Sequence, residues 1–273
     1  MVNREYREVP YPSSRFGTID LGRIGARKHH VAGLLEIDVT EALRPVSTGG
    51  EGAERASFFA WMVNTISLCV AEDPHVHAMQ GRRGRIVLFD EVDVTVLVEK
   101  KVDGQRVPLP LVIRGANEKS ALEIHREIRD AQRRTVRDEG DYVLGGSDAP
   151  PAKGMRFFYM LPGRLRVFLI GLVLRNPLRA KGMMGTVVIT SIGSAGRLPG
   201  WVIPRSMHNL CFALGSVIRK PWVVGDRMEI REILHMTVLF DHDVVDGAPA
   251  ARFMAKLVDR LEEGRDETPL ISV

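Results

Sequence analysis

Strand-like and helical segments alternate along the chain, and this alternation limits the possible folds more than any other feature of the sequence. Apolar residues recur at helical spacing in residues 57–71, 120–137 and 247–263, and Ser120 with Glu123 has the pattern of a capping box. Strand patterns occur at residues 34–39, 85–89, 92–98, 108–113, 186–192, 210–218 and 233–240. Because strands and helices intermix rather than segregate, the sequence predicts a single α/β domain with a mixed sheet.

The length of 273 residues is enough for one domain with a substantial core. Residues 1–19 are polar and contain Pro10 and Pro12, so we expect an extended N-terminal arm. Residues 20–273 make up the expected domain, with an insertion at about residues 140–182.

Charge and cysteine content disfavour several functional classes. The chain has 38 basic and 34 acidic side chains, and its two arginine clusters (82–85 and 133–137) contain few aromatic residues. A solvated face is therefore favoured over a nucleic-acid partner, although a basic patch also suits the phosphates of a nucleotide-containing cofactor. Two isolated cysteines fit a reducing cytoplasm better than a disulfide framework. Neither a signal-type segment nor a transmembrane stretch of about 18 apolar residues is present, so we expect a cytoplasmic protein.

Two histidine pairs, His29 with His30 and His75 with His77, invite a metal hypothesis. No cysteine or acidic pair stands at ligand spacing from them, so we interpret them as surface or loop histidines and expect no metal.

The segment DHDVVDG at residues 241–247 has the composition of a catalytic turn. It follows a predicted strand and presents His242, whose side-chain type suits proton transfer near neutral pH. A carboxylate such as Asp246 can fix the orientation of a histidine, and Gly247 leaves room for a substrate or a backbone. Asp246 is equally explained as the N-cap of the last helix, and a lone histidine is more often structural than catalytic.

Four segments together resemble one family. The pattern His-x-x-x-Asp-Gly after a strand is similar to the signature of chloramphenicol acetyltransferase and of the catalytic domain of dihydrolipoamide acyltransferases from 2-oxo acid dehydrogenase complexes. Residues 185–193 (GTVVITSIG) resemble that family's glycine-threonine strand and following turn, residues 203–215 its next strand, and residues 111–120 (LVIRGANEKS) its stretch before a helix. The resemblance runs in the family's order from about residue 20 to 263 and implies a chloramphenicol acetyltransferase-like two-layer sandwich.

The resemblance also implies a mechanism. His242 would be the general base that removes a proton from the thiol of coenzyme A or of an acceptor, and the thiolate would attack a thioester. Thr190 would donate a hydrogen bond to the oxyanion, and Asp246 would hold the geometry of the site. Ser191, Gly193 and Gly247 would line the channel for substrate and coenzyme A. The family places this channel between the subunits of a trimer, which implies a homotrimer or a higher oligomer.

The chain departs from the family's pattern at two points that concern the reaction. We expect no lipoyl or subunit-binding domain before residue 20 and no covalently attached lipoyl group, so an acyl carrier or lipoyl group would come from a separate protein. Asp243 stands where the family usually has arginine, and a carboxylate beside a histidine favours the protonated ring. Two alternatives therefore remain beside the acyltransferase: a catalytically idle oligomeric scaffold and a small-molecule O-acetyltransferase.

The third departure is the insertion, whose apolar runs at residues 155–162 and 167–174 are flanked by arginines. It has three interpretations: an added helical hairpin on the core, a lid over a subunit or substrate channel, and a membrane-surface contact through residues 155–180. Since insertions beside active sites often change the substrate, we expect this segment to favour a longer or more apolar acyl group.

Overall fold

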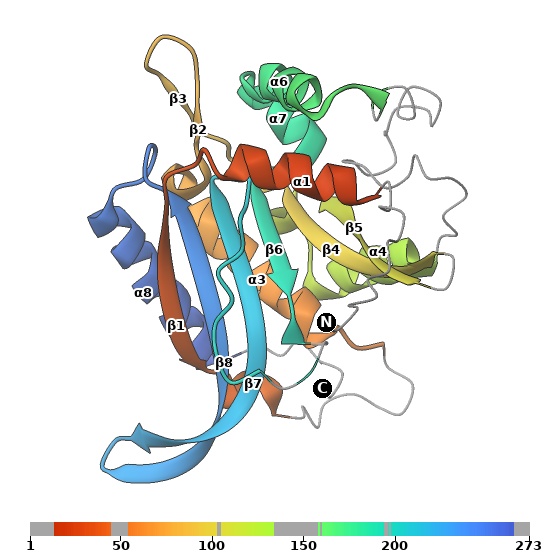
Figure 1. The fold of residues 1–273 in the computed structure, drawn as a ribbon. Helices are drawn as coiled ribbons and strands as arrows, with labels where there is room; N and C mark the ends of the chain where they lie inside the picture. Colours follow the sequence, from red (N-terminus) through yellow and green to blue (C-terminus); the bar gives the residue numbers. More distant parts are fainter. Residues whose placement is uncertain are drawn as a thin grey trace, which may run out of the picture.

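A six-stranded mixed sheet forms the centre of the molecule (Figure 1). The computed structural model describes residues 14–44, 54–102, 105–133, 158, 160–193, 196 and 198–264. The strand order is β1 (His30–Asp38), β8 (Arg227–Asp241), β7 (Leu210–Val224), β6 (Val187–Ser191), β4 (Val94–Val102) and β5 (Gln105–Ile113). β6 runs parallel to both of its neighbours and the remaining pairs are antiparallel. The predicted α/β class with a mixed sheet is confirmed.

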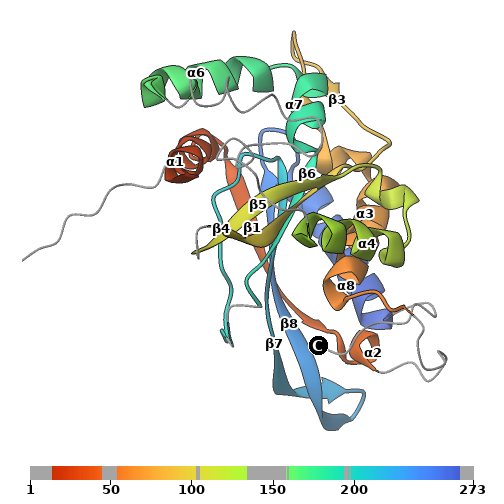
Figure 2. The ribbon, with the colours of Figure 1, turned by 90° about the vertical axis from the view of Figure 1, so that its right-hand side faces the viewer.

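Three helices cover one face of the sheet: α3 (Phe58–Glu72), α4 (Ala121–Arg133) and α8 (Gly247–Glu263) (Figure 2). Alternate residues of the strands point toward these helices, and they form the main core cluster that includes Ile189, Phe212 and Val238. The predicted capping box closes the start of α4. The Ser120 N–H donates to the Glu123 carboxylate at 2.8 Å, and the Ser120 hydroxyl accepts the Glu123 N–H at 3.3 Å.

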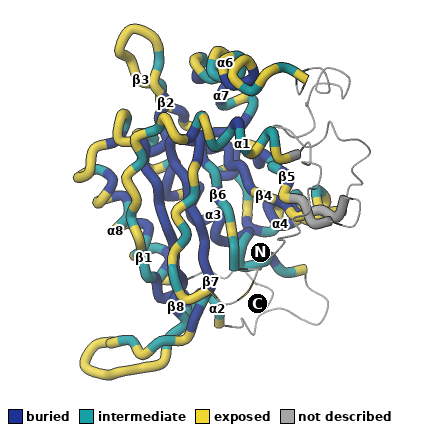
Figure 3. Tube along the Cα trace, viewed as in Figure 1, coloured by how far each residue is buried: buried dark blue, intermediate teal, exposed yellow. Residues whose placement is uncertain are grey.

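β7 and β8 are longer than the predicted strands, which ended at residue 218 and began at residue 233. Beyond those positions the two strands continue as a protruding two-stranded arm whose residues are mostly exposed (Figure 3). Within the arm the strands pair with each other but bury no face, and the exposed residues include Val223, Met228 and Ile230. The burial of the two strands therefore stops before their hydrogen-bonded pairing does.

A second group of elements, which we call the cap, lies at the end of the sheet where β8 finishes (Figure 1). It consists of α1 (Ser14–Gly25), α6 (Gly163–Leu174), α7 (Pro177–Met184) and the hairpin formed by β2 (Met79–Gln80) and β3 (Ile86–Val87). A smaller apolar cluster packs the cap together, with Met79, Phe89, Ala180, Met184 and Met207 as its buried members.

The cap changes two expectations. Residues 14–25 form helix α1, so an arm that remains extended up to residue 19 is wrong for this part, and residues 1–13 lie outside the described residues. Helices α6 and α7 occupy the part of the 140–182 insertion that is described, while residues 140–157 and 159 lie outside it. None of the described helices is long and apolar enough to span a membrane.

Shorter elements connect these parts: α2 (Thr40–Leu43) and the two single-turn helices η1 (Pro74–His77) and η2 (Ala116–Glu118). The segment 198–209 crosses the sheet face opposite α3 and α8. Its Leu198 N–H donates to Ser216 Oγ of β7 at 2.9 Å, and the Trp201 indole donates to the Leu35 carbonyl of β1 at 2.8 Å.

Candidate active site

The turn between β8 and α8 holds His242 by its backbone and leaves its side chain exposed. The His242 N–H donates to the His29 carbonyl at 3.0 Å, which ties the turn to the start of β1. The N–H groups of Val244 and Val245 both donate to the Asp241 carbonyl, and the Val245 side chain is buried. The structure thus presents the predicted base on a fixed backbone.

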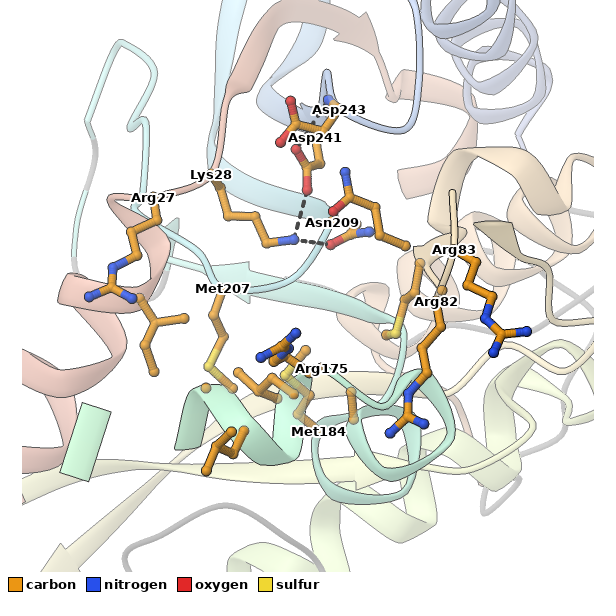
Figure 4. A pocket seen from close by; sticks show the side chains of 18 residues that line it. Arg27, Lys28, Arg82, Arg83, Arg175, Met184, Met207, Asn209, Asp241 and Asp243 are labelled. Atoms are coloured by element: carbon orange, nitrogen blue, oxygen red, sulfur yellow. Dashed lines mark hydrogen bonds and ion pairs between the residues drawn. The ribbon is translucent and has the colours of Figure 1, made fainter. Parts of the chain in front are cut away.

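Beneath the turn lies a buried polar cluster that the sequence did not reveal (Figure 4). The Asp241 side chain is almost fully buried and accepts a hydrogen bond from Lys28 Nζ at 2.7 Å. Lys28 also donates to Asn209 Oδ1 at 2.5 Å, and the Asn209 amide donates to the Ala78 carbonyl at 2.6 Å. Since a buried carboxylate is stable only when paired and hydrogen-bonded, Lys28 and Asn209 help to fix the strand end that carries His242. The nearest signal in the sequence was the aspartate at the end of an apolar strand.

The Asp243 carboxylate contacts His29 rather than the neighbouring His242. Its Oδ1 lies 2.9 Å from Nδ1 of His29, and both side chains are exposed. This hydrogen bond and the negative charge of Asp243 raise the pKa of His29 above its usual value. The carboxylate that was expected to affect the candidate base is therefore paired with His29, which immediately precedes β1, the strand beside β8.

Asp246 and Gly247 open α8. Asp246 occupies the N-cap position in extended conformation, but its exposed side chain makes no capping hydrogen bond, and only its carbonyl accepts the Ala250 N–H at 3.1 Å. A Cβ atom at Gly247 would meet nothing within 4 Å in this chain. The Asp246 carboxylate and the space at Gly247 are therefore both open to another molecule.

Thr190, Ser191 and Gly193 lie at the C-terminal end of β6 or just after it, at the end of the sheet opposite to the His242 turn. Thr190 is half-buried near the end of β6, Ser191 is exposed, and a Cβ atom at Gly193 would lie only 2.9 Å from the Gly215 carbonyl oxygen. The glycine is therefore required by the close approach of the turn to β7.

One chain does not bring Thr190 and His242 together. Thr190 pairs with Ala213, which pairs with Thr237, so two strand spacings separate β6 from β8. His242 follows Thr237 by five residues, which is roughly 16 Å along an extended strand. The two predicted catalytic side chains therefore belong to separate parts of the surface of a single chain.

The other histidines and the cysteines have structural surroundings. His77 is buried, contrary to the expected surface or loop position, and it contacts Thr186 Oγ1 at 2.8 Å and the Phe89 carbonyl at 3.0 Å. Burial lowers the pKa of His77 and of His208 to about 4. Both cysteines are free and buried, and burial raises the pKa of Cys211 to about 12. No group of three or more potential metal ligands exists among the described residues.

A cavity of about 950 Å³ opens beside the His242 turn, between the cap and the ends of β7 and β8 (Figure 4). Asp241 and Asp243, which flank His242 in the sequence, contribute to its wall. Its other walls come from the end of α1, the β2–β3 hairpin, α6 and α7. The cavity therefore extends from the two aspartates beside the candidate base to helices α6 and α7.

Comparisons with known proteins agree with this architecture. The model of the family described as 2-oxoacid dehydrogenases acyltransferase (catalytic domain) matches residues 27–139 and 172–267. The lipoamide acyltransferase component of the branched-chain alpha-keto acid dehydrogenase complex of Bacillus subtilis is 21% identical over 96% of this chain and 56% of its own length. The chain thus spans little more than half the length of this relative.

Two solved structures show the same fold. The dihydrolipoamide acetyltransferase of Azotobacter vinelandii superposes with a TM-score of 0.67 at 18% identity, covering 95% of this chain and 92% of that one. A chloramphenicol acetyltransferase superposes with a TM-score of 0.51 at 15% identity, covering 92% and 96%. The fold is therefore chloramphenicol acetyltransferase-like, as the sequence predicted. Because the family model matches well over half of its residues, the chain belongs to the family of 2-oxoacid dehydrogenase acyltransferase catalytic domains.

Proposed function

We propose that this protein is an acyltransferase that moves an acyl group between coenzyme A and a thiol, such as a dihydrolipoyl group carried on another protein. The observation that carries the proposal is the His242 turn, in which backbone hydrogen bonds hold an exposed histidine at the end of β8. Family membership supplies the reaction class. Both cysteines are free thiols, which supports a reducing compartment such as the cytoplasm.

His242 would act as the general base. It takes the proton of the attacking thiol, and the thiolate adds to the thioester carbonyl to form a tetrahedral oxyanion. When the intermediate collapses, the C–S bond to the first thiol breaks and the departing thiolate takes the proton back from the imidazolium. Base catalysis of this kind contributes typically about 10²–10⁴-fold to the rate.

Thr190 would stabilise the oxyanion, and Asp246 would orient the site. In the Azotobacter vinelandii enzyme, studied for the role of a serine, a histidine and an asparagine in its catalytic mechanism, the serine precedes the histidine by 52 residues and the asparagine follows it by four. Thr190 and Asp246 stand at the same two spacings from His242. Threonine retains the hydroxyl donor, and Asp246 is free of a capping bond that would occupy its carboxylate.

The site would be completed by a second copy of the chain. His242 and Thr190 are too far apart in one chain to act on the same carbonyl, since a donor must lie about 3 Å from the oxyanion. A homotrimer or higher oligomer, in which His242 of one copy faces Thr190, Ser191 and Gly193 of the next, removes this difficulty.

Mixing two inactive variants tests the chemistry and the shared site together. His242→Ala should lower kcat at least about 10²-fold, and Thr190→Val about 10²–10³-fold, without a change in folding because both side chains are at least partly exposed. When the variants are co-refolded in equal amounts, about one site in four combines an intact His242 with an intact Thr190, so thioester-dependent transfer should recover to roughly that fraction.

Arg252→Ala, an exposed change on α8, is the control and should leave kcat unaltered. Wild-type protein that turns over no acyl thioester, with coenzyme A or a carrier as acceptor, would be the idle scaffold instead. Activity in the parents without recovery on mixing would rule out a site shared between copies.

A further inference from the structure

Three buried methionines form one part of the wall of the cavity beside the His242 turn, and we call this part the floor. Met79, Met184 and Met207 line it and are each at most 6% exposed, and Leu174 packs against the same cluster. Methionine side chains are unbranched and adaptable, so they accept chains of different shape. The volume of about 950 Å³ is at the upper end of the range for drug-sized ligands and far exceeds what an acetyl group needs.

The rim of the cavity is cationic. Arg27 of the α1 end, Arg82 and Arg83 of the hairpin, and Arg175 after α6 are all exposed and line the opening. Among the described residues, no carboxylate lies within ion-pair distance of any of the four guanidinium groups. The two carboxylates of the cavity wall already have cationic or histidine partners, Lys28 for Asp241 and His29 for Asp243.

Asn209, another buried polar side chain of this wall, also has its hydrogen-bonding groups occupied within the chain. Asn209 uses its oxygen to accept from Lys28 and its amide nitrogen to donate to the Ala78 carbonyl. Gln80 also lines the cavity, but it is exposed. Against the methionine and leucine part of the wall, an amide group in the middle of a ligand would have no hydrogen-bond partner, and an unpaired buried amide is unfavourable. An alkyl chain has no such requirement.

We propose that this cavity binds the acyl chain of the substrate, and that this acyl chain is a long alkyl chain with a carboxylate at its far end. The carbonyl end would lie toward the His242 turn, the alkyl chain on the methionine floor, and the terminal carboxylate on the arginine rim, whose planar guanidinium groups match carboxylates in bidentate geometry. The role as an acyl subsite rests on the proposed function. The binding of an amphipathic carboxylate does not.

Binding of decanoate, measured by calorimetry, tests the assignment without turnover. Decanoate should bind wild type and His242→Ala alike. Hexanoate should bind more weakly by about two- to fourfold for each missing methylene. Decanol, which lacks the charge, should bind at least about 10-fold more weakly than decanoate.

A matched pair of double variants tests the rim. Arg82→Gln with Arg175→Gln should weaken decanoate at least about 10-fold, since both cations line the cavity. Arg85→Gln with Arg179→Gln removes two exposed arginines from the same hairpin and from α7 that do not line it, and should change nothing. In the active protein, the preference for decanedioyl-CoA over decanoyl-CoA should fall only in the first pair.

Three results would overturn the proposal. The first is decanol binding as tightly as decanoate, and the second is an equal loss of decanoate affinity in both double variants. The third is tighter binding of 4′-phosphopantetheine than of decanoate in a competition for the cavity. The last result would assign the cavity to the coenzyme arm. Decanoate binding without any thioester turnover would leave the cavity assignment standing and reject only the acyltransferase.

Discussion

The helix-backed face of the sheet and the cap at its end are held together by different interactions. Behind the sheet, α3, α4 and α8 bury one large apolar cluster that includes the contacting rings of Phe212, Phe240 and Phe253. The cap has only a small apolar cluster and relies on buried polar contacts. Apolar packing does not depend on protonation, whereas buried polar contacts do, so the two regions should respond differently to the same perturbation.

The polar contacts within the cap, and those between the cap and the sheet, join residues that are far apart in the sequence. Asp20 of α1 pairs with Arg166 of α6 with an Nε–Oδ2 distance of 2.6 Å, and both side chains are almost fully buried. Asp93, just before β4, accepts from Arg114 and from Lys181 of α7 at 2.9 Å each and from the Gly115 N–H at 3.0 Å. Burial alone would raise the pKa of Asp93, but the hydrogen bonds from Gly115, Lys181 and Arg114 keep it below its usual value. His208 contacts the Met184 carbonyl at 2.8 Å.

The largest change should come from the helix-backed face. Phe253→Ala removes a ring that is 2% exposed, and we expect a loss of about 3–5 kcal/mol in the free energy of unfolding. The loss should be the same at pH 7 and pH 5 because none of the three rings titrates. Urea denaturation at both pH values measures it, with Arg252→Ala as the exposed neighbour for comparison; a strongly pH-dependent loss would contradict the distinction between the regions.

The next effect should appear at acid pH and come from two buried histidines beside the cap, His77 and His208. Burial lowers the pKa of His77 and His208 from 6.5 to about 4, so the folded state favours the neutral rings. Their stabilisation is fully present above pH 6.5 and is lost as the pH falls from 6.5 toward 4, by roughly 3 kcal/mol for each ring. His77→Gln should remove the part due to His77, so its unfolding free energy should fall less between pH 7 and pH 4.5 than that of wild type.

The comparison variant for this measurement is His75→Gln, which changes an exposed histidine two residues away. It should follow the wild-type dependence on pH. An equal slope in wild type and His77→Gln would show that the acid response arises elsewhere.

The smallest effect should be local to the cap. Asp20→Asn weakens a buried charge-assisted hydrogen bond, and we expect a loss of about 1.5–3 kcal/mol. Amide hydrogen exchange should accelerate in α1 and α6 and stay unchanged in α3 and α8. Replacing both partners, Asp20→Leu with Arg166→Met, should restore much of the protection because no buried charge is left unpaired; acceleration throughout the core would instead make the cap part of one cooperative unit.

The same contrast explains how far the sequence predicted the fold. The helices predicted at residues 57–71 and 247–263 match α3 (Phe58–Glu72) and α8 (Gly247–Glu263), because an apolar stripe and a local stop signal define each of them. Helix α1 was missed. Its sequence contains Gly17 and Gly22, which disfavour a helix, and its buried Asp20 is satisfied by a residue 146 positions later in the chain.

The candidate site divides in the same way. The sequence determined the strand, the turn and the helix around His242, since local pattern and spacing define all three. Only the tertiary structure showed that Asp243 is paired with His29 and that Lys28 and Asn209 support the turn. Only the strand register showed that Thr190 lies at the end of the sheet opposite to His242. Those facts depend on strand order and register, which bring together residues far apart in the sequence and which no local pattern records.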